Sequence, residues 1–124
     1  MIDIPTKIDP KKVTLGLGFY GRSFTLADPA CTQAGCPFSA GGNPGECTAS
    51  SGTLSFAEIQ RVINTGATVS LDSAAAVKIV VFDNNQWVSY DDEETLKMKI
   101  DYANSKCLGG LMVSYPMALP AFIP

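Results

Sequence analysis

The sequence of 124 residues contains no histidine. Histidine is the general base of Ser/His/Asp and Cys/His nucleophile systems and a frequent zinc ligand, so these kinds of site are excluded. Basic residues are also scarce, with 9 Lys and Arg against 12 Asp and Glu. The resulting sequence pI of about 4.7 offers no cationic face to phosphate backbones or anionic lipids. We therefore expect no metal site, no cofactor and no nucleic-acid partner.

Long apolar runs are missing as well. The longest stretches, such as residues 79–82, are far shorter than the roughly 20 residues that cross a bilayer. Residues 1–12 lack the apolar centre of a secretory signal peptide. The sequence thus predicts no membrane partner and no signal peptide, and its 46% hydrophobic content suits one small domain.

The cysteines are few but crowded. The four candidates for disulfides are Cys31, Cys36, Cys47 and Cys107. Three of them lie in a stretch rich in Gly, Pro and Ser, a pattern typical of disulfides that hold a core-poor loop in an exported protein. Three pairings are open, and a four-thiolate zinc site is disfavoured because the spacing differs from that of zinc knuckles.

Apolar patterning predicts the first elements of the chain. Residues 13–20 begin with a β-branched pair and run apolar, as a strand buried on both faces does. Residues 23–26 continue as a more exposed strand. An Asp-Pro pair then opens a loop that lasts until about residue 51.

A helix and a hairpin are predicted next. Ser55 and Glu58 form a capping-box pattern ahead of an apolar stripe at helical spacing, and Gly66 is a plausible end signal. The β-prone runs 77–82 and 86–90 are separated by a turn-rich tripeptide, which predicts an antiparallel hairpin.

The last elements are a second helix and a strand. Asp91 is the expected cap of this helix, with Glu94 in the third position. We interpret the acidic cluster of residues 91–94 as a helix start rather than a catalytic group, since carboxylates are favoured at helix amino ends. Residues 111–113 are predicted to form another buried strand.

Three segments resemble, in this order, the family 18 glycoside hydrolases, and the cysteine pattern resembles the fungal chitinases among them. Residues 16–24 are similar to the end of the seventh barrel strand, residues 83–92 to the start of the seventh barrel helix, and residues 107–113 to the eighth strand. The resemblance implies an α+β fold. A chitinase insertion domain, an antiparallel sheet plus one helix, would be flanked by the last two strands and one helix of an incomplete TIM barrel.

This resemblance predicts four segments and a carboxyl-terminal fragment, because a complete barrel needs at least about 200 residues. The segments are an amino-terminal segment and barrel-type strand (1–22), the insertion domain (23–90), a barrel-type helix and last strand (91–113) and an unrelated tail (114–124). The resemblance stops abruptly after Val113. Our hypothesis is that the reading frame enters an intron or shifts there, and a transcript that encodes this tail unchanged would refute it.

Three substrate-binding residues are implied by the resemblance. Tyr20 and Arg22 match a pair that lines the cleft and hydrogen-bonds N-acetylglucosamine units, with Gly21 letting the backbone turn between them. The alternatives are an ion pair of Arg22 with Asp28 or Asp72, and a tyrosine that fills the core.

Met112 matches a methionine beside the reacting sugar, and core filling is the alternative. Ser114 departs from the family, which has a tryptophan at this position as the floor for the reacting sugar; a serine cannot stack. Tyr115 would point to the opposite face of the strand. The resemblance implies that Trp87 packs in the core of the insertion domain, and a sugar-stacking platform is the alternative.

No catalytic residue is predicted. The family's acid ends a DxxDxDxE motif that this sequence lacks, although the substrate's own N-acetyl oxygen replaces the usual second carboxylate. Whether the chain is an enzyme is left open, and alone it is expected not to cut chitin.

Three hypotheses about function remain. The first is a fragment of an extracellular chitinase whose parent hydrolyses β-1,4-linked N-acetylglucosamine polymers, retaining part of the chitin-binding cleft. The second is a non-catalytic module that binds chitin or chitin oligosaccharides. The third is a truncated gene product without function, since two barrel strands alone expose unpaired edges. Oligomeric state is not predicted.

Overall fold

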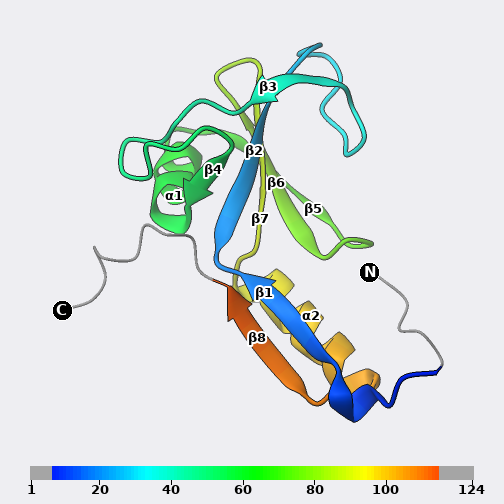
Figure 1. Ribbon diagram of the computed structural model, residues 1–124. Coiled ribbons are helices and arrows are strands. Elements are labelled where there is room, and N and C mark those ends of the chain that lie inside the picture. Colours follow the sequence, from blue (N-terminus) through cyan, green and yellow to red (C-terminus); the bar gives the residue numbers. More distant parts are fainter. Residues whose placement is uncertain (1–6, 115–124) are drawn as a thin grey trace.

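The computed structural model describes residues 7–114 and divides them between two sheets (Figure 1). The smaller sheet has two strands, and the larger has six. The predictions for Tyr115 and for the tail 115–124 lie outside the described residues, as does the beginning of the amino-terminal segment. The architecture is the predicted α+β mixture of an antiparallel sheet and two helices.

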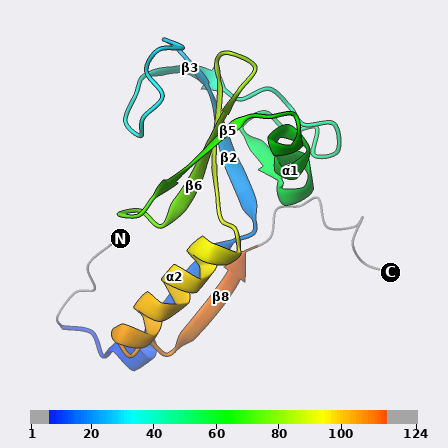
Figure 2. The same cartoon turned by 180° about the vertical axis from the view of Figure 1, so that it is seen from behind.

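The two-stranded sheet is parallel. After the short 3-10 helix η1 (Pro10–Lys12), β1 (Thr14–Gly18) pairs with β8 (Gly110–Ser114) in a register without bulges. The helix α2 (Glu93–Ser105) lies along one face of this pair (Figure 2). Parallel strands need a long connection, and here it runs through the whole six-stranded sheet and then α2.

Both strands of this sheet were predicted to be buried, and that prediction is wrong. Leu17 is the buried residue of β1, whereas Leu111, Met112 and Val113 are 43%, 51% and 45% exposed. Within residues 7–114, no further strand pairs with either outer edge of the sheet. The expected single strand over 13–20 is also divided, since β1 ends at Gly18 and the next strand begins at Tyr20.

The six-stranded sheet is antiparallel, with the order β3-β2-β7-β6-β5 and β4 paired to β2. Its strands are β2 (Tyr20–Leu26), β3 (Phe38–Gly41), β4 (Thr53–Ser55), β5 (Thr68–Asp72), β6 (Val77–Phe82) and β7 (Gln86–Tyr90). The predicted hairpin of β6 and β7 is confirmed. The short strands β3 and β4 and the exposed strand β5 were not predicted.

The helix α1 (Phe56–Asn64) starts with the predicted capping box. Ser55 Oγ accepts a hydrogen bond from the Glu58 amide at 3.3 Å, and Glu58 Oε2 accepts one from the Ser55 amide at 2.7 Å. The helix packs beside β2 and β4 (Figure 2). The core cluster comprises Leu54, Ile59, Val80, Val88 and Tyr90, with Val62, Ile63, Ala67 and Phe82 against it.

Gly21 serves this packing and not a turn, so the predicted role is wrong. It lies inside β2, where a Cβ atom would come within 2.5 Å of Ile59 Cδ1 and 2.6 Å of Val88 Cγ2. Real Cβ atoms do not approach other carbons so closely, because interiors are already close-packed. A glycine at this position lets α1 and β7 close onto β2.

The cap of α2 is Asp92 and not the predicted Asp91. The Asp92 side chain accepts from the Thr95 amide at 3.1 Å, and Thr95 Oγ1 accepts from the Asp92 amide at 3.0 Å. The Asp91 carboxylate instead accepts hydrogen bonds from Lys99 Nζ and from Thr95 Oγ1. Only one of two adjacent aspartates can directly precede the first turn, and Thr95 completes the box from Asp92.

Two of the four candidate cysteines are joined. Cys31 and Cys36 form a disulfide, with their Cα atoms 5.8 Å apart. The prediction of disulfides is wrong for Cys47 and Cys107, which are free and exposed. Cys47 lies in the loop before β4 and Cys107 follows α2, so they belong to different parts of the molecule (Figure 1), and a disulfide needs Cα atoms within about 7 Å.

Candidate functional site

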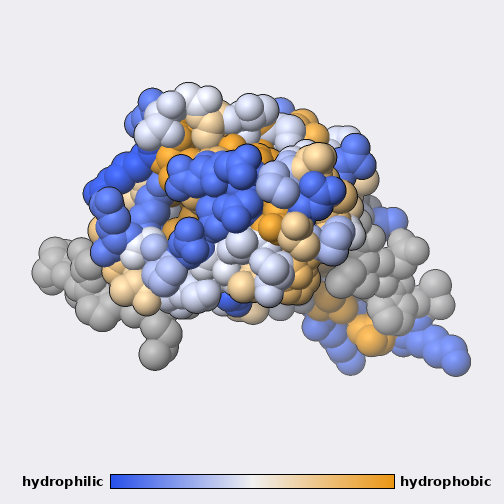
Figure 3. Space-filling model, turned by 90° about the horizontal axis from the view of Figure 1, so that it is seen from above, coloured by the Kyte–Doolittle hydropathy of each residue, from blue (hydrophilic) through white to orange (hydrophobic). Residues whose placement is uncertain are grey.

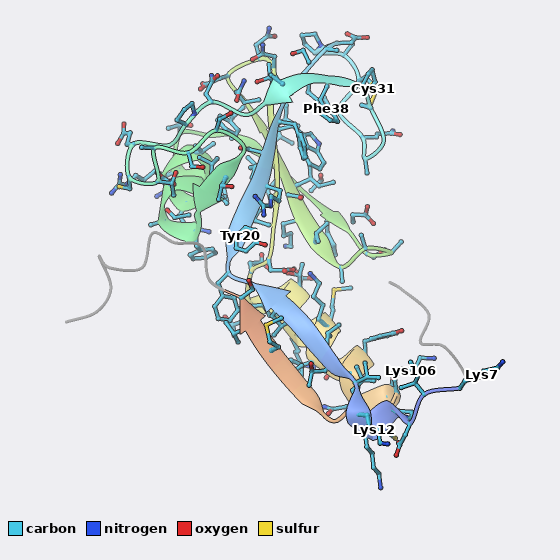
Figure 4. All side chains as sticks on the ribbon, viewed as in Figure 1. Lys7, Lys12, Tyr20, Cys31, Phe38 and Lys106 are labelled. Carbon is cyan, nitrogen blue, oxygen red and sulfur yellow. A yellow bond between two sulfur atoms is a disulfide. The ribbon has the colours of Figure 1, made fainter. Side chains whose placement is uncertain are left out.

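Tyr20 lies where the two sheets meet. It begins β2 directly after Phe19, whose amide donates to the Ser114 carbonyl at the carboxyl end of β8 at 3.4 Å. Figure 4 shows Tyr20 at this junction, next to the end of β1. The carboxyl ends of parallel strands are where TIM-barrel folds place their binding sites.

Arg22 is stacked on Tyr20. Its guanidinium carbon lies 4.8 Å from the centroid of the Tyr20 ring, and its Nη1 donates to Thr53 Oγ1 on β4 at 2.9 Å. Side chains alternate along a strand, so Tyr20 and Arg22 share the face of β2 opposite Gly21 and the core. Arg22 is exposed. Its planar group is therefore oriented by the protein while most of its donors stay open to a ligand.

The alternative ion pairs of Arg22 are not formed among the described residues. Asp28 Oδ1 accepts from the Ala30 amide at 2.9 Å, and Asp72 Oδ1 accepts from the amides of Ala74 and Ala75 at 3.1 Å. Each aspartate thus closes its own turn. Tyr20 is partly buried but lies outside the core cluster, so the core-filling alternative is not supported either.

Met112 occupies a separate position on β8. It pairs with Gly16 of β1, and a Cβ atom on Gly16 would lie 3.5 Å from Met112 Cε. The methionine side chain therefore lies over the bare backbone of β1, and it is not core filling, because it is 51% exposed. Its contact with a sugar stays a prediction.

Trp87 is not in the core, contrary to the prediction. Strand alternation turns Val88 and Tyr90 of β7 inward and Trp87 outward, onto the face that carries Arg22. Its indole Nε1 donates to the Thr32 carbonyl at 3.0 Å, and its ring packs against Phe24, 6.0 Å between centroids. The sequence signal for this outer face was the spacing of Tyr20, Arg22 and Phe24 at every second position of one strand.

Glu58 was predicted only as part of a capping box, yet it also holds the loop before β4. Its Oε1 accepts from the amides of Cys47 at 2.7 Å and Thr48 at 2.9 Å, and the residue is 5% exposed. Burial would raise the pKa of Glu58, but the amides of Thr48, Ser55 and Cys47 together lower it below its usual value. The charged carboxylate fixes both ends of the segment that presents Thr53 to Arg22.

The sequence matches a known family over nearly its whole length. The model of the glycosyl hydrolases family 18 aligns with residues 3–113. The chain belongs to family 18. Human chitinase-3-like protein 2 is 39% identical over 83% of this chain and 26% of its own length.

Solved structures of family 18 proteins agree with this assignment. The immunomodulatory active chitinase TsES1 from Trichuris suis superposes with a TM-score of 0.81 at 32% identity, over 86% of this chain and 29% of its own. Human YKL-39 gives a TM-score of 0.79 at 37% identity, over 88% and 29%. Because the family 18 chain covers less than a third of these relatives, their activities do not pass to it by similarity alone.

In residues 7–114, no three Cys, Asp or Glu side chains group so as to hold a metal ion. No helix in the same range is long and apolar enough to span a membrane.

Proposed function

We propose that this family 18 chain forms one wall of a cleft that binds chitin oligosaccharides, and that by itself it binds them without cutting them. The observation that carries the proposal is the exposed Arg22 guanidinium, stacked on Tyr20 and held by Thr53 at the carboxyl ends of β1 and β8. Met112 on β8 is proposed as a further contact, because it is the exposed side chain of that strand with the greatest reach.

The chemistry of the pair suits an acetylated sugar. A guanidinium donates several hydrogen bonds in one plane, which fits ring hydroxyls and an acetamide oxygen. The Tyr20 ring lies under the guanidinium, and its hydroxyl can donate or accept a hydrogen bond. Because Thr53 and the Tyr20 ring already restrict Arg22, binding loses less side-chain entropy than it would with a free arginine.

Two relatives support this choice of ligand. YKL-39 is described as a pseudo-chitinase with retained chitooligosaccharide-binding properties. A family 18 chitinase of Cycas revoluta, similar to this chain with a TM-score of 0.71, has been solved with (GlcNAc)3. The Cys31–Cys36 disulfide supports an extracellular location, since such bonds persist in oxidising compartments.

The proposed absence of cleavage rests on the missing acid motif and on the contacts of the acidic cluster. The sequence holds no DxxDxDxE motif. In the acidic cluster at the start of α2, Asp91 is bound to Lys99, Asp92 caps the helix and Glu94 is bound to Lys78 at 2.7 Å. These three carboxylates stabilise the start of the helix, a structural role that differs from that of a general acid, which protonates a leaving oxygen.

A titration with two ligands tests the proposal. Calorimetry of the full chain with a chitin hexasaccharide is expected to show saturable binding, and chromatography of the mixture is expected to show no shorter products. A cellulose hexasaccharide, which lacks the acetamide groups, is the matched control and should bind more weakly. Equal affinity for both ligands, or no binding of the chitin hexasaccharide, would refute the proposal, and shorter products would refute the non-catalytic part.

A further inference from the structure

We infer that the binding wall continues along β2 to an aromatic platform of Phe24, Phe38 and Trp87, which takes additional N-acetylglucosamine units of the same oligosaccharide. This inference rests on the proposed function, and it adds the far end of the six-stranded sheet to the site. The platform lies on the face that carries Tyr20 and Arg22, and it involves none of the residues that the family resemblance pointed to as contacts.

The platform and the Tyr20–Arg22 pair share one face of β2. Tyr20, Arg22 and Phe24 are alternate residues of this strand, so their side chains point to the same side. On the neighbouring strand β7, Ser89 is paired with Arg22, and Trp87 is paired with Phe24. The face therefore presents a polar row and then an aromatic row, in sequence along the strand.

The aromatic rings form a compact group with an exposed outer member. The centroids of Phe24 and Phe38 are 4.8 Å apart, and those of Phe24 and Trp87 are 6.0 Å apart. Phe38 is 59% exposed, the largest exposed fraction among the large apolar side chains of the described residues. A ring so exposed contributes little to the core, but its face is available to the apolar side of a sugar ring.

The length of the strand sets the reach of the wall. From Tyr20 to Phe24 the chain advances four residues, or about 13 Å at the usual rise of a β-strand. This distance exceeds one pyranose ring, so a ligand long enough to reach both ends must be an oligosaccharide. Figure 4 places Tyr20 at the junction of the sheets and Phe38 at the opposite end of β2.

The face of the molecule seen from above is amphipathic. Seen from above, the molecule shows apolar and hydrophilic areas side by side (Figure 3). Such alternation suits a chitin chain, because each sugar carries polar edges and apolar faces.

The platform is also held rigid. Trp87 Nε1 donates to the Thr32 carbonyl at 3.0 Å, and Thr32 lies in the short loop closed by the Cys31–Cys36 disulfide. The loop thus fixes the indole in one orientation, which reduces the entropy lost when a sugar binds. The disulfide is a positioning element of this site.

The test compares a chitin trisaccharide with a chitin hexasaccharide on the full chain and two variants. Phe38→Ala is expected to lower the affinity for the hexasaccharide about tenfold, in line with the loss of one aromatic contact, and to leave the trisaccharide affinity unchanged. Phe56→Ala is the matched control, since Phe56 is also an exposed phenylalanine (46%) but belongs to α1; it should bind both ligands as the wild type does.

Trp87 supplies an independent readout, because it is the only tryptophan of the chain. The hexasaccharide is expected to change its emission, and Cys31→Ser/Cys36→Ser is expected to weaken this response. Hexasaccharide binding that Phe38→Ala leaves unchanged, with no change in Trp87 emission, would overturn the inference while leaving the proposed function intact. Failure of the wild type to bind either ligand would overturn the proposed function, and this inference with it.

Discussion

The guanidinium carbon of Arg22 lies 4.8 Å from the centre of the Tyr20 ring. A cation over an aromatic face is attracted by about 0.5–1 kcal/mol at an exposed position. This attraction is small, but together with the hydrogen bond to Thr53 it selects one orientation of a long, flexible side chain. The fold thus orients the side chain that we propose as the main ligand contact.

Arg22→Ala should lower the affinity for a chitin hexasaccharide about tenfold or more, because hydrogen bonds from a charged donor contribute about 1.5–3 kcal/mol. Arg22→Lys keeps the charge but loses the planar guanidinium, so its affinity should lie between those of the wild type and Arg22→Ala. Calorimetry measures both. Arg61→Ala is the control, since Arg61 is exposed and paired with Glu46. An Arg22→Ala variant that binds as tightly as Arg61→Ala would contradict this role.

Gly21→Ala should lower the free energy of unfolding by about 1–3 kcal/mol, because the added methyl group would meet Ile59 and Val88 at 2.5 and 2.6 Å. Ile59→Val removes the Cδ1 atom of this clash. The double variant should therefore be more stable than the sum of the two single losses predicts. Urea unfolding of all three variants measures the coupling. Strict additivity would show that the two residues do not compete for this space.

Glu58→Gln should destabilise the protein by about 1–3 kcal/mol at neutral pH, since a buried carboxylate that accepts several amides would be replaced by a weaker acceptor. Glu46→Gln is the control, because the Glu46 side chain is 88% exposed in its ion pair with Arg61. It should lower the free energy of unfolding by less than about 0.5 kcal/mol.

The pH dependence of the Glu58 effect follows from the sign of its pKa shift. The pKa of Glu58 in the folded protein lies below its usual value of 4.5, so the unfolded chain takes up a proton first as the pH falls. The stabilisation by the Glu58 carboxylate is complete above pH 4.5, and it is lost as the pH falls through the pKa of the folded protein. Unfolding curves of wild type and Glu58→Gln should converge in acid. A difference that persists unchanged there would contradict this account.

Lys99→Met should cost about 2–3 kcal/mol of stability, because it leaves the Asp91 carboxylate, whose side chain is 9% exposed, without its cation. Lys97→Met is the matched control on the same helix. Lys97 pairs with Asp101 at i,i+4, but both side chains are more than half exposed, so the loss should be about 0.3–0.5 kcal/mol. Thermal unfolding separates them, and equal losses would show that burial of Asp91 has no effect.

Local signals in the sequence predicted elements well. The Ser55–Glu58 capping box involves only residues three apart, and it forms as expected. The hairpin of β6 and β7 follows from a short turn between two β-prone runs, and it is also confirmed. The sequence pattern did not distinguish Asp91 from Asp92 as the cap, because each aspartate has a possible partner three residues later, Glu94 or Thr95. In the structure Thr95 completes the box with Asp92, and Asp91 pairs with Lys99.

Non-local relationships were predicted poorly. β4 is three residues long, and it exists because its residues pair with β2 residues that lie 31 to 35 positions earlier in the sequence. The outward position of Trp87 follows from the alternation of side chains along β7, but its place opposite Phe24 depends on the register of the two strands, which neither strand sets alone. Likewise, the pairing of Cys31 with Cys36, one of three possibilities, required the path of the loop.

The residues of the candidate site also differ in whether the sequence alone could identify them. Tyr20 and Arg22 were found through a motif, and the structure places both on one exposed face. Thr53 and Phe38 were missed, because each reaches that face from a strand that the sequence pattern did not predict. The residues that orient the site are the ones that depend on tertiary structure.

The most direct test of the binding wall is a set of amide and arginine side-chain NMR spectra of the full chain, recorded as a chitin hexasaccharide is added. The account predicts that the largest shifts belong to Tyr20, Arg22 and Thr53, with the Arg22 Nε–H signal among them. Saturating shifts confined to other surfaces, or spectra unchanged by the ligand, would contradict it.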